Sequence, residues 1–177
     1  MALRPDHRCF DDPLQATKAV LRSLARRIAA LEAEIAELDA TLAELVRRAA
    51  PRTIALPAIG VDHAGQLLVT VGDRPERLRS EAAFAHLCGV APIPASSGRT
   101  QRHRLHRGGD PGANRALHLA VVVRLRCCPR TRRYVERRTA EGLSKPEIMR
   151  CLKRYLAREV FHTLSADLQD LHGLDSI

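Results

Sequence analysis

The apolar residues near the start of the chain recur in alternating steps of three and four. The run of leucines and isoleucines from residue 21 to residue 45 keeps this spacing without a slip, as in the heptad pattern of a two-stranded coiled coil. One amphipathic helix that lies on its own domain would show a similar stripe, and the flanking charges leave partner and orientation open. We predict a coiled-coil helix over 14–50 with eight seam residues: Leu21, Leu24, Ile28, Leu31, Ile35, Leu38, Leu42 and Leu45.

Beyond residue 50 the signals indicate further helices, and no strand pattern is strong. Serine and aspartate mark helix starts because their side chains accept hydrogen bonds from the first turn, and glycine marks helix ends because it adopts the left-handed conformation. These signals predict helices over 81–88 (after Ser80, closed by Gly89), 111–126 (after Asp110), 129–141 (closed by Gly142) and from 145 (after Ser144). In the second of these helices the predicted core residues are Leu117, Ala120, Val121 and Val123, with His118 as a core histidine.

A short segment between the first helix and these later ones is close to the helix-hairpin-helix pattern. It reads Leu56-Pro57-Ala58-Ile59-Gly60, with Ala64 four residues on. In such hairpins, backbone N–H groups at a helix start approach a DNA phosphate without reading sequence. Gly60 is therefore a candidate nucleic-acid contact. Ala58 replaces the usual first glycine, and an ordinary helix pair that packs for structural reasons is the competing interpretation.

Together these patterns predict an all-α protein, in which an N-terminal coiled-coil helix precedes a compact helical domain with a helix-hairpin-helix-like element. The length of 177 residues suits one domain with an accessory element. The expected divisions are a polar N-terminal segment (1–13), the coiled-coil helix (14–50), the helical domain (51–165) and a C-terminal tail (166–177).

Positive charge is concentrated after the coiled-coil helix. The formal net charge is +9, yet residues 1–50 hold eight Lys/Arg and eight Asp/Glu, so all of the excess lies in 51–177. Between Arg99 and Arg138 there are twelve arginines and two acidic residues. Because the guanidinium fork matches phosphate oxygens, this density favours a polyanionic partner. Only five aromatic residues occur, which argues against a platform that stacks single-stranded bases.

The remaining composition favours a soluble cytoplasmic protein with no membrane partner. Five cysteines without a CxxC pair do not form a disulfide framework. The polar, acidic start is unlike a secretory signal, and no apolar run approaches the roughly 18 residues that span a bilayer.

The candidate chemistry lies in the stretch PASSGRTQRHRLHRGG, residues 94–109. From spacing alone, Ser96-Ser97-Gly98 indicates a turn in a basic loop. A serine hydroxyl needs a base, a metal or strongly positive surroundings to attack a phosphodiester, and the nearby arginines offer the last of these. His103, His106 and Asp110 do not make a convincing metal site, because the arginines between them would repel a cation. The four carboxylates of a two-metal nuclease are absent as well.

Two segments resemble a known family. Residues 89–118, GVAPIPASSGRTQRHRLHRGGDPGANRALH, and 129–159, PRTRRYVERRTAEGLSKPEIMRCLKRYLARE, are similar to the C-terminal domain of transposases of the insertion sequence 110 family. The segment over 56–73 and the heptads resemble what precedes that domain in the family. The resemblance covers about residues 14–165.

The resemblance implies a two-part enzyme for DNA transposition and recombination. An N-terminal RuvC-like domain holds metal-binding carboxylates, a coiled coil mediates homo-oligomer assembly, and a serine of the C-terminal domain becomes covalently joined to DNA. A structured noncoding bridge RNA selects the DNA. Carried onto this chain, the nucleophile is Ser97, with Ser96 as fallback. The residues implied to hold nucleic acid are Arg99, Arg102, Arg104, Arg107 and Arg115.

Some positions depart from the family pattern. Ala58 puts the backbone phosphate contact in doubt, and Cys127-Cys128 stands where a His-Asp pair is common. Nothing in this sequence corresponds to the RuvC-like domain, so Mg²⁺ is expected only with that domain and no cofactor is expected in this chain. Two hypotheses follow: the serine-bearing part of a transposase, or a truncated non-catalytic remnant that dimerises and binds DNA or RNA.

Overall fold

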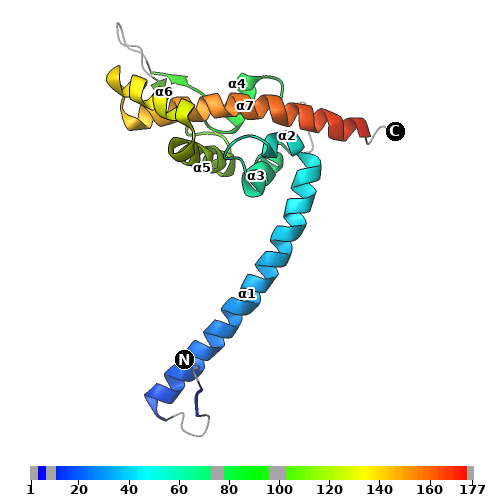
Figure 1. Cartoon of the computed structure of the whole chain (residues 1–177), viewed down its shortest axis with the longest axis vertical. Coiled ribbons are helices and arrows are strands. Elements are labelled where there is room, and N and C mark those ends of the chain that lie inside the picture. Colours follow the sequence, from blue (N-terminus) through cyan, green and yellow to red (C-terminus); the bar gives the residue numbers. More distant parts are fainter. Residues whose placement is uncertain (1–3, 7–10, 73–77, 96–102, 175–177) are drawn as a thin grey trace. The chain divides into compact units, whose positions relative to one another are not determined.

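The computed structural model describes residues 4–6, 11–72, 78–95 and 103–174 (Figure 1). The predicted helical architecture is confirmed, with seven helices and one two-stranded antiparallel sheet in these ranges. No helix among the described residues is both long and apolar enough to cross a membrane. The elements are α1 (Pro13–Ala49), α2 (Pro51–Ile54), α3 (Val61–Val71), α4 (Glu81–Leu87), β1 (Ile93–Pro94), β2 (His103–Arg104), α5 (Pro111–Cys127), α6 (Pro129–Ala140) and α7 (Lys145–Leu174).

The chain divides into two compact units, Met1–Glu44 and Leu45–Ile177. The first unit holds most of α1, which confirms the long N-terminal helix. The eight heptad residues predicted for the seam are between 38% and 63% exposed, and Val46 is the first buried residue of α1. The described part of the chain therefore leaves the apolar stripe of α1 exposed.

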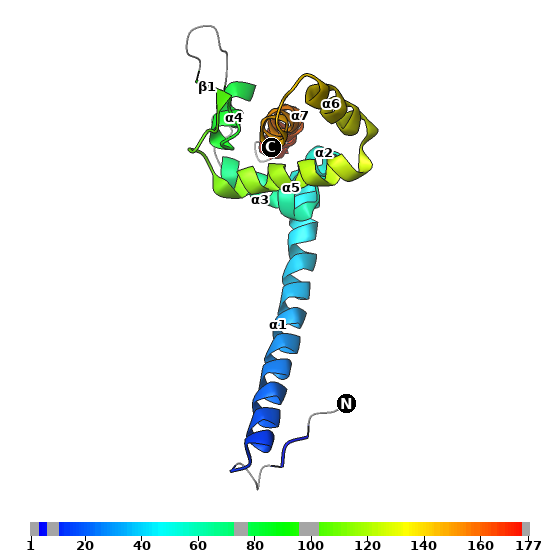
Figure 2. The same cartoon turned by 90° about the vertical axis from the view of Figure 1, so that its left-hand side faces the viewer.

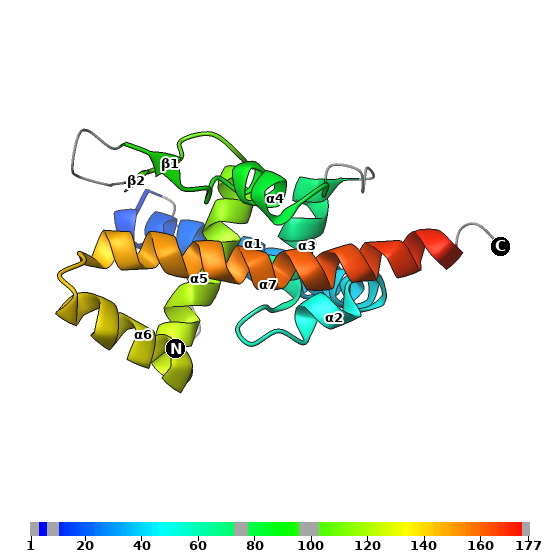
Figure 3. The same ribbon diagram turned by 90° about the horizontal axis from the view of Figure 1, so that it is seen from above.

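The second unit is built around α7. Helices α2, α4, α5 and α6 all contact α7, and α3 packs on α5; Figure 3 shows α7 lengthwise with α4 and α2 on opposite sides of it. The core that these helices enclose is apolar, which is the main stabilising contribution to such a domain. Its largest fully buried apolar side chains include Leu67, Val71, Phe84, Leu117, Val121, Leu156, Val160 and Leu164.

Local signals in the sequence mark the helix ends correctly. Ser80 Oγ accepts a hydrogen bond from Ala83 N at 3.1 Å, which confirms the predicted cap of α4. Gly89 and Gly142 follow α4 and α6 with φ of 64° and 87°, in the left-handed region. Ser144 at the start of α7 donates its N–H to a Glu147 carboxylate oxygen, as in the reaching-back half of a capping box.

Two expectations about burial were wrong. On α5 the predicted core residues Leu117, Ala120 and Val121 are buried as expected, but Val123 is 44% exposed and His118 is exposed, because both lie off the face that meets the core. The segment 166–177 was expected to be a tail, but α7 continues to Leu174. Its extension is held by packing, since Asp167 and Leu168 are 2% and 5% exposed.

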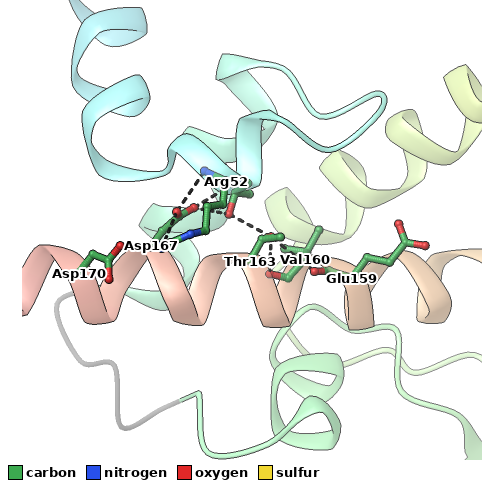
Figure 4. A network of polar contacts seen from close by, with 7 residues as sticks. Arg52, Glu159, Val160, Thr163, Asp167 and Asp170 are labelled. Atoms are coloured by element: carbon green, nitrogen blue, oxygen red, sulfur yellow. Dashed lines mark hydrogen bonds and ion pairs between the residues drawn. The ribbon is translucent and has the colours of Figure 1, made fainter.

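A buried carboxylate in the C-terminal part of α7 caps α2. Asp167 Oδ2 accepts hydrogen bonds from Thr53 N at 2.9 Å and Thr53 Oγ1 at 2.8 Å, and its Oδ1 accepts from Arg52 N at 3.1 Å (Figure 4). These N–H groups belong to the first turn of α2, where no residue of the helix can accept from them. Asp167 thus caps a helix more than a hundred residues away in sequence.

The turn between α2 and α3 contains the one described non-glycine residue with positive φ. Ala58 has φ of 66°, a conformation that costs an L-residue roughly 1–2 kcal/mol and that glycine adopts freely. Gly60 is the N-cap of α3 with extended backbone, φ −94° and ψ −177°. The position that needs glycine is therefore Ala58, where the pattern normally has one. The helix-hairpin-helix interpretation stays a prediction.

We expect Asp167→Asn to lower the free energy of unfolding by about 1–3 kcal/mol, because an amide leaves at least one of the buried donors of Arg52 and Thr53 without an acceptor. Urea unfolding followed by circular dichroism measures the change. The control is Asp170→Asn, which removes an ion pair of Arg52 with a 64% exposed carboxylate and should cost less than about 1 kcal/mol. Equal losses in both variants would contradict the capping role of Asp167.

Candidate nucleic-acid interface

In the sequence, the candidate serine lies between two short strands that pair with each other. Strands β1 and β2 pair antiparallel, with Ile93 opposite Arg104 and Pro94 opposite His103. Ser96, Ser97, Arg99 and Arg102 lie outside the described residues, so the structure does not place them. Because β1 and β2 pair, the residues just before and just after this segment lie side by side.

Two glycines hold the base of this hairpin. Gly89 and Gly109 both have positive φ, 64° and 91°. A Cβ atom on Gly109 would lie 2.4 Å from Gly89 N, and one on Gly89 would lie 2.6 Å from Gly108 O. Next to this crossing, Asp110 N donates a hydrogen bond to Leu87 O at 2.7 Å. Only glycine allows the segments before and after the hairpin to approach so closely.

An asparagine ties this crossing to α5 and α7. The Asn114 Nδ2 donates to Cys88 O at 3.1 Å and to Gly89 O at 2.9 Å. Its Oδ1 accepts a hydrogen bond from Lys153 Nζ at 2.8 Å. One side chain therefore connects the start of the hairpin, the first turn of α5 and the N-terminal half of α7.

Asp110 starts α5 as predicted. Its Oδ1 accepts from Gly112 N at 2.6 Å, and its Oδ2 lies 2.7 Å from the Thr70 hydroxyl of α3, which donates to it. The hydrogen bond from Thr70 and those from the backbone N–H groups lower the pKa of the Asp110 carboxyl, although desolvation opposes them. A depressed folded-state pKa means that this carboxylate stabilises the fold above its unfolded pKa and loses that contribution as pH falls through the lowered value.

The structure brings together two of the arginines assigned to nucleic acid. Arg107 and Arg115 line an open hollow of about 510 Å³ together with His106 and His118. Arg107 and Arg115 are both exposed, so their guanidinium groups can reach a phosphate in solvent. The exposed His118, which was expected in the core, thus belongs to a basic surface.

Other predicted residues lie elsewhere. Arg104, on β2, lines a second cavity between the hairpin and α6 and α7. Gly60 lines neither this cavity nor the hollow of Arg107. Among the described residues, no three His, Cys, Asp or Glu side chains form a group that could hold a metal ion.

Asn114 and Lys153 were not predicted from the sequence. Each lies in a helix that was predicted, but their contact joins segments 39 residues apart. One signal was present: Lys153 stands three residues before Leu156, on the face of α7 that is buried. A lysine on a buried apolar face needs a hydrogen-bond acceptor or an anion next to its ammonium group.

Comparison with known proteins identifies relatives of this site. A family model described as "Transposase IS116/IS110/IS902 family" matches residues 52–136, which include the hairpin. The "Insertion element IS900 uncharacterized 42 kDa protein" of Mycobacterium paratuberculosis is 30% identical over 159 residues, 88% of this chain and 39% of that protein. The "Insertion element IS110 uncharacterized 43.6 kDa protein" of Streptomyces coelicolor is 34% identical over 123 residues, 68% of this chain and 29% of that protein. The chain spans well under half the length of both.

We expect Gly109→Ala to be much more destabilising than Gly142→Ala. The two glycines have similar φ, 91° and 87°, so each substitution carries about 1–2 kcal/mol of backbone strain. Only at Gly109 would the new methyl group also overlap backbone atoms, whereas nothing lies within 4 Å at Gly142; this overlap should add about 1–3 kcal/mol. Thermal unfolding of the two variants measures the difference, and equal losses would contradict the close crossing.

Proposed function

The chain belongs to the IS116/IS110/IS902 family of transposases, and we propose that it acts in DNA transposition as the part that binds DNA and supplies the serine nucleophile. The observation that carries the proposal is the glycine-anchored hairpin. It lies within the family match, and the loop between its strands contains Ser97. Arg104, Arg107 and Arg115 flank the base of that loop as cations open to solvent.

The proposed reaction is a transesterification. The Ser97 Oγ attacks a phosphodiester phosphorus, an Oγ–P bond forms, and the bond from phosphorus to the leaving strand oxygen breaks. That oxygen takes up a proton, and the serine proton passes to solvent or to a base. In the second step a strand hydroxyl attacks the phosphoserine and releases Ser97. No oxidant or reductant is needed, and the energy of the phosphodiester is conserved in the adduct.

The arginines supply the electrostatic part of this chemistry. Negative charge grows on the phosphoryl oxygens as the attacking oxygen approaches, and fixed cations beside them stabilise it. Contacts to the sugar-phosphate backbone position the DNA without reading its sequence. In this proposal, a bridge RNA selects the DNA sequence. Mg²⁺ would be bound by the carboxylates of a RuvC-like domain, which nothing in this sequence matches.

A second copy of this chain is the proposed partner of α1. The heptad residues are unbroken from Leu21 to Leu45 and exposed within the chain, and a two-stranded coiled coil would bury them. This proposal is independent of the serine chemistry.

The alternative function is that of a non-catalytic remnant that dimerises and binds DNA or RNA. The solvent-accessible arginines and the heptads would serve it equally well. The formation of a covalent adduct separates the two functions, since both predict binding that weakens with salt.

We expect a detergent-stable adduct between this chain and labelled element-end DNA when a RuvC-like part is supplied. Ser97→Ala should abolish the adduct, because the nucleophilic oxygen is gone, while Ser96→Ala should retain it. Denaturing electrophoresis detects the product. An adduct that persists in Ser97→Ala and disappears in Ser96→Ala would move the nucleophile to the fallback residue. Absence of any adduct, with DNA binding intact, would favour the remnant.

We expect Leu31→Asp to convert the oligomer to monomer, because a charge at a seam position loses its hydration on pairing. Ala29→Asp, two positions earlier and off the seam, is the control and should leave the oligomer intact. Sedimentation velocity measures the mass of each. If Leu31→Asp sediments like the unmodified chain, pairing through this stripe is refuted.

A further inference from the structure

A second basic cavity lies beside the hairpin. It has a volume of about 550 Å³, and its walls come from the hairpin, the end of α6 and the N-terminal half of α7; Figure 2 shows β1, α7 and α6 from another side. Glu147 is the single acidic residue of the lining. The lysine and arginine residues that line it are Arg104, Arg138, Arg150, Lys153 and Arg154.

Lys153 is buried without a carboxylate partner among the described residues. It is 7% exposed, and its Nζ donates to the neutral Asn114 Oδ1. Desolvation lowers its pKa, and the positive charge of Arg150 lowers it further. Burial of a cation beside another cation is costly unless an anion compensates it.

Arg154 also has unused hydrogen-bonding capacity. Its Nη1 is buried and has no hydrogen-bond partner in the described part of the chain. Neither Arg150 nor Arg154 forms an ion pair with a described carboxylate, whereas Arg138 pairs with Glu141. Glu147 already accepts from the N–H and hydroxyl of Ser144. Positive charge therefore exceeds negative charge in the cavity.

We infer that this cavity binds a phosphate group of the DNA strand that Ser97 attacks, through Arg150, Lys153 and Arg154. The inference rests on the proposed function. Guanidinium groups suit phosphate because they donate paired hydrogen bonds to its oxygens. His103, which lines the cavity, pairs with Pro94, three residues before Ser97. Three residues of chain span at most roughly 10 Å, so Ser97 lies within about three nucleotides of Pro94, for a strand that rises roughly 3.4 Å per nucleotide.

Occupation of this cavity would also act on the hairpin. Lys153 Nζ donates a hydrogen bond to Asn114 Oδ1, and Asn114 Nδ2 donates to the backbone carbonyls of Cys88 and Gly89. A phosphate beside Lys153 would accept from the same Nζ that donates to Asn114. DNA binding and the anchoring of the hairpin are therefore coupled through two side chains.

The test measures DNA binding by Arg150→Gln and Arg154→Gln in the full chain. A short labelled duplex is titrated by fluorescence anisotropy at several salt concentrations. Each variant should bind about ten-fold more weakly, the usual effect of removing one hydrogen bond to a charged group. The slope of log affinity against log salt should fall by about 0.9 for each phosphate that the variant no longer neutralises. Glutamine keeps the helix propensity, and circular dichroism checks folding.

The matched control is Arg132→Gln on α6, which removes the same charge from an exposed residue outside the cavity. It should weaken binding much less than the cavity variants. An equal loss in the control would show that net charge alone matters and would overturn the inference. Effects confined to a structured RNA probe, with duplex binding unchanged, would overturn the assignment to DNA.

The covalent adduct separates this inference from the proposed function, because duplex binding is measured without a covalent step. If the cavity variants bind the duplex as tightly as the unmodified chain while the Ser97 adduct still forms, the inference alone fails. If the adduct never forms but the arginine effects are found, the serine chemistry alone fails.

Discussion

The crossing of Gly89 and Gly109 is the constraint on which the site depends. Each residue occupies a conformation and a space that exclude a side chain. Because the two segments meet there, the exit of α4, the hairpin and the start of α5 are fixed relative to one another. Asp110 and Asn114 then fasten this junction to α3 and α7. A functional segment is positioned more precisely when it leaves a rigid base, and this crossing provides a rigid base for the hairpin.

Helix α7 serves two purposes along its length. Toward its C-terminal end it is structural, since Asp167 completes the first turn of α2 and apolar residues fill the core. Toward its N-terminal end it carries uncompensated positive charge beside the hairpin. Stability that comes from the first part can offset the unfavourable burial of Lys153 in the second. Natural proteins commonly retain such unfavourable groups where they bind a ligand.

The sequence could predict what local chemistry determines. Ser80, Asp110 and Gly142 mark helix ends through hydrogen bonds and backbone angles within a few residues, and the heptads of α1 need no other part of the chain. Which residues of α5 are buried was harder to predict. The contacts of α5 with α3 and α7 decide which face is buried, and Val123 and His118 lie off that face. The contacts of Asn114 with Lys153 and of Thr53 with Asp167 join distant segments, and no local pattern encodes them. The candidate serine was found through family resemblance, since its spacing alone indicates a turn.

The cap that Asp167 places on α2 bears on how the domain is delimited. The family match ends at residue 136, before α7 begins. Yet α2, the first helix inside the match, is capped by Asp167 of α7. Asn114, which holds the base of the hairpin, accepts a hydrogen bond from Lys153 of α7. The segment that matches the family model is thus shorter than the segment that the fold needs, because the fold also needs α7. An excised segment cut at the edge of the match would keep the family signature and lose the scaffold that gives it shape.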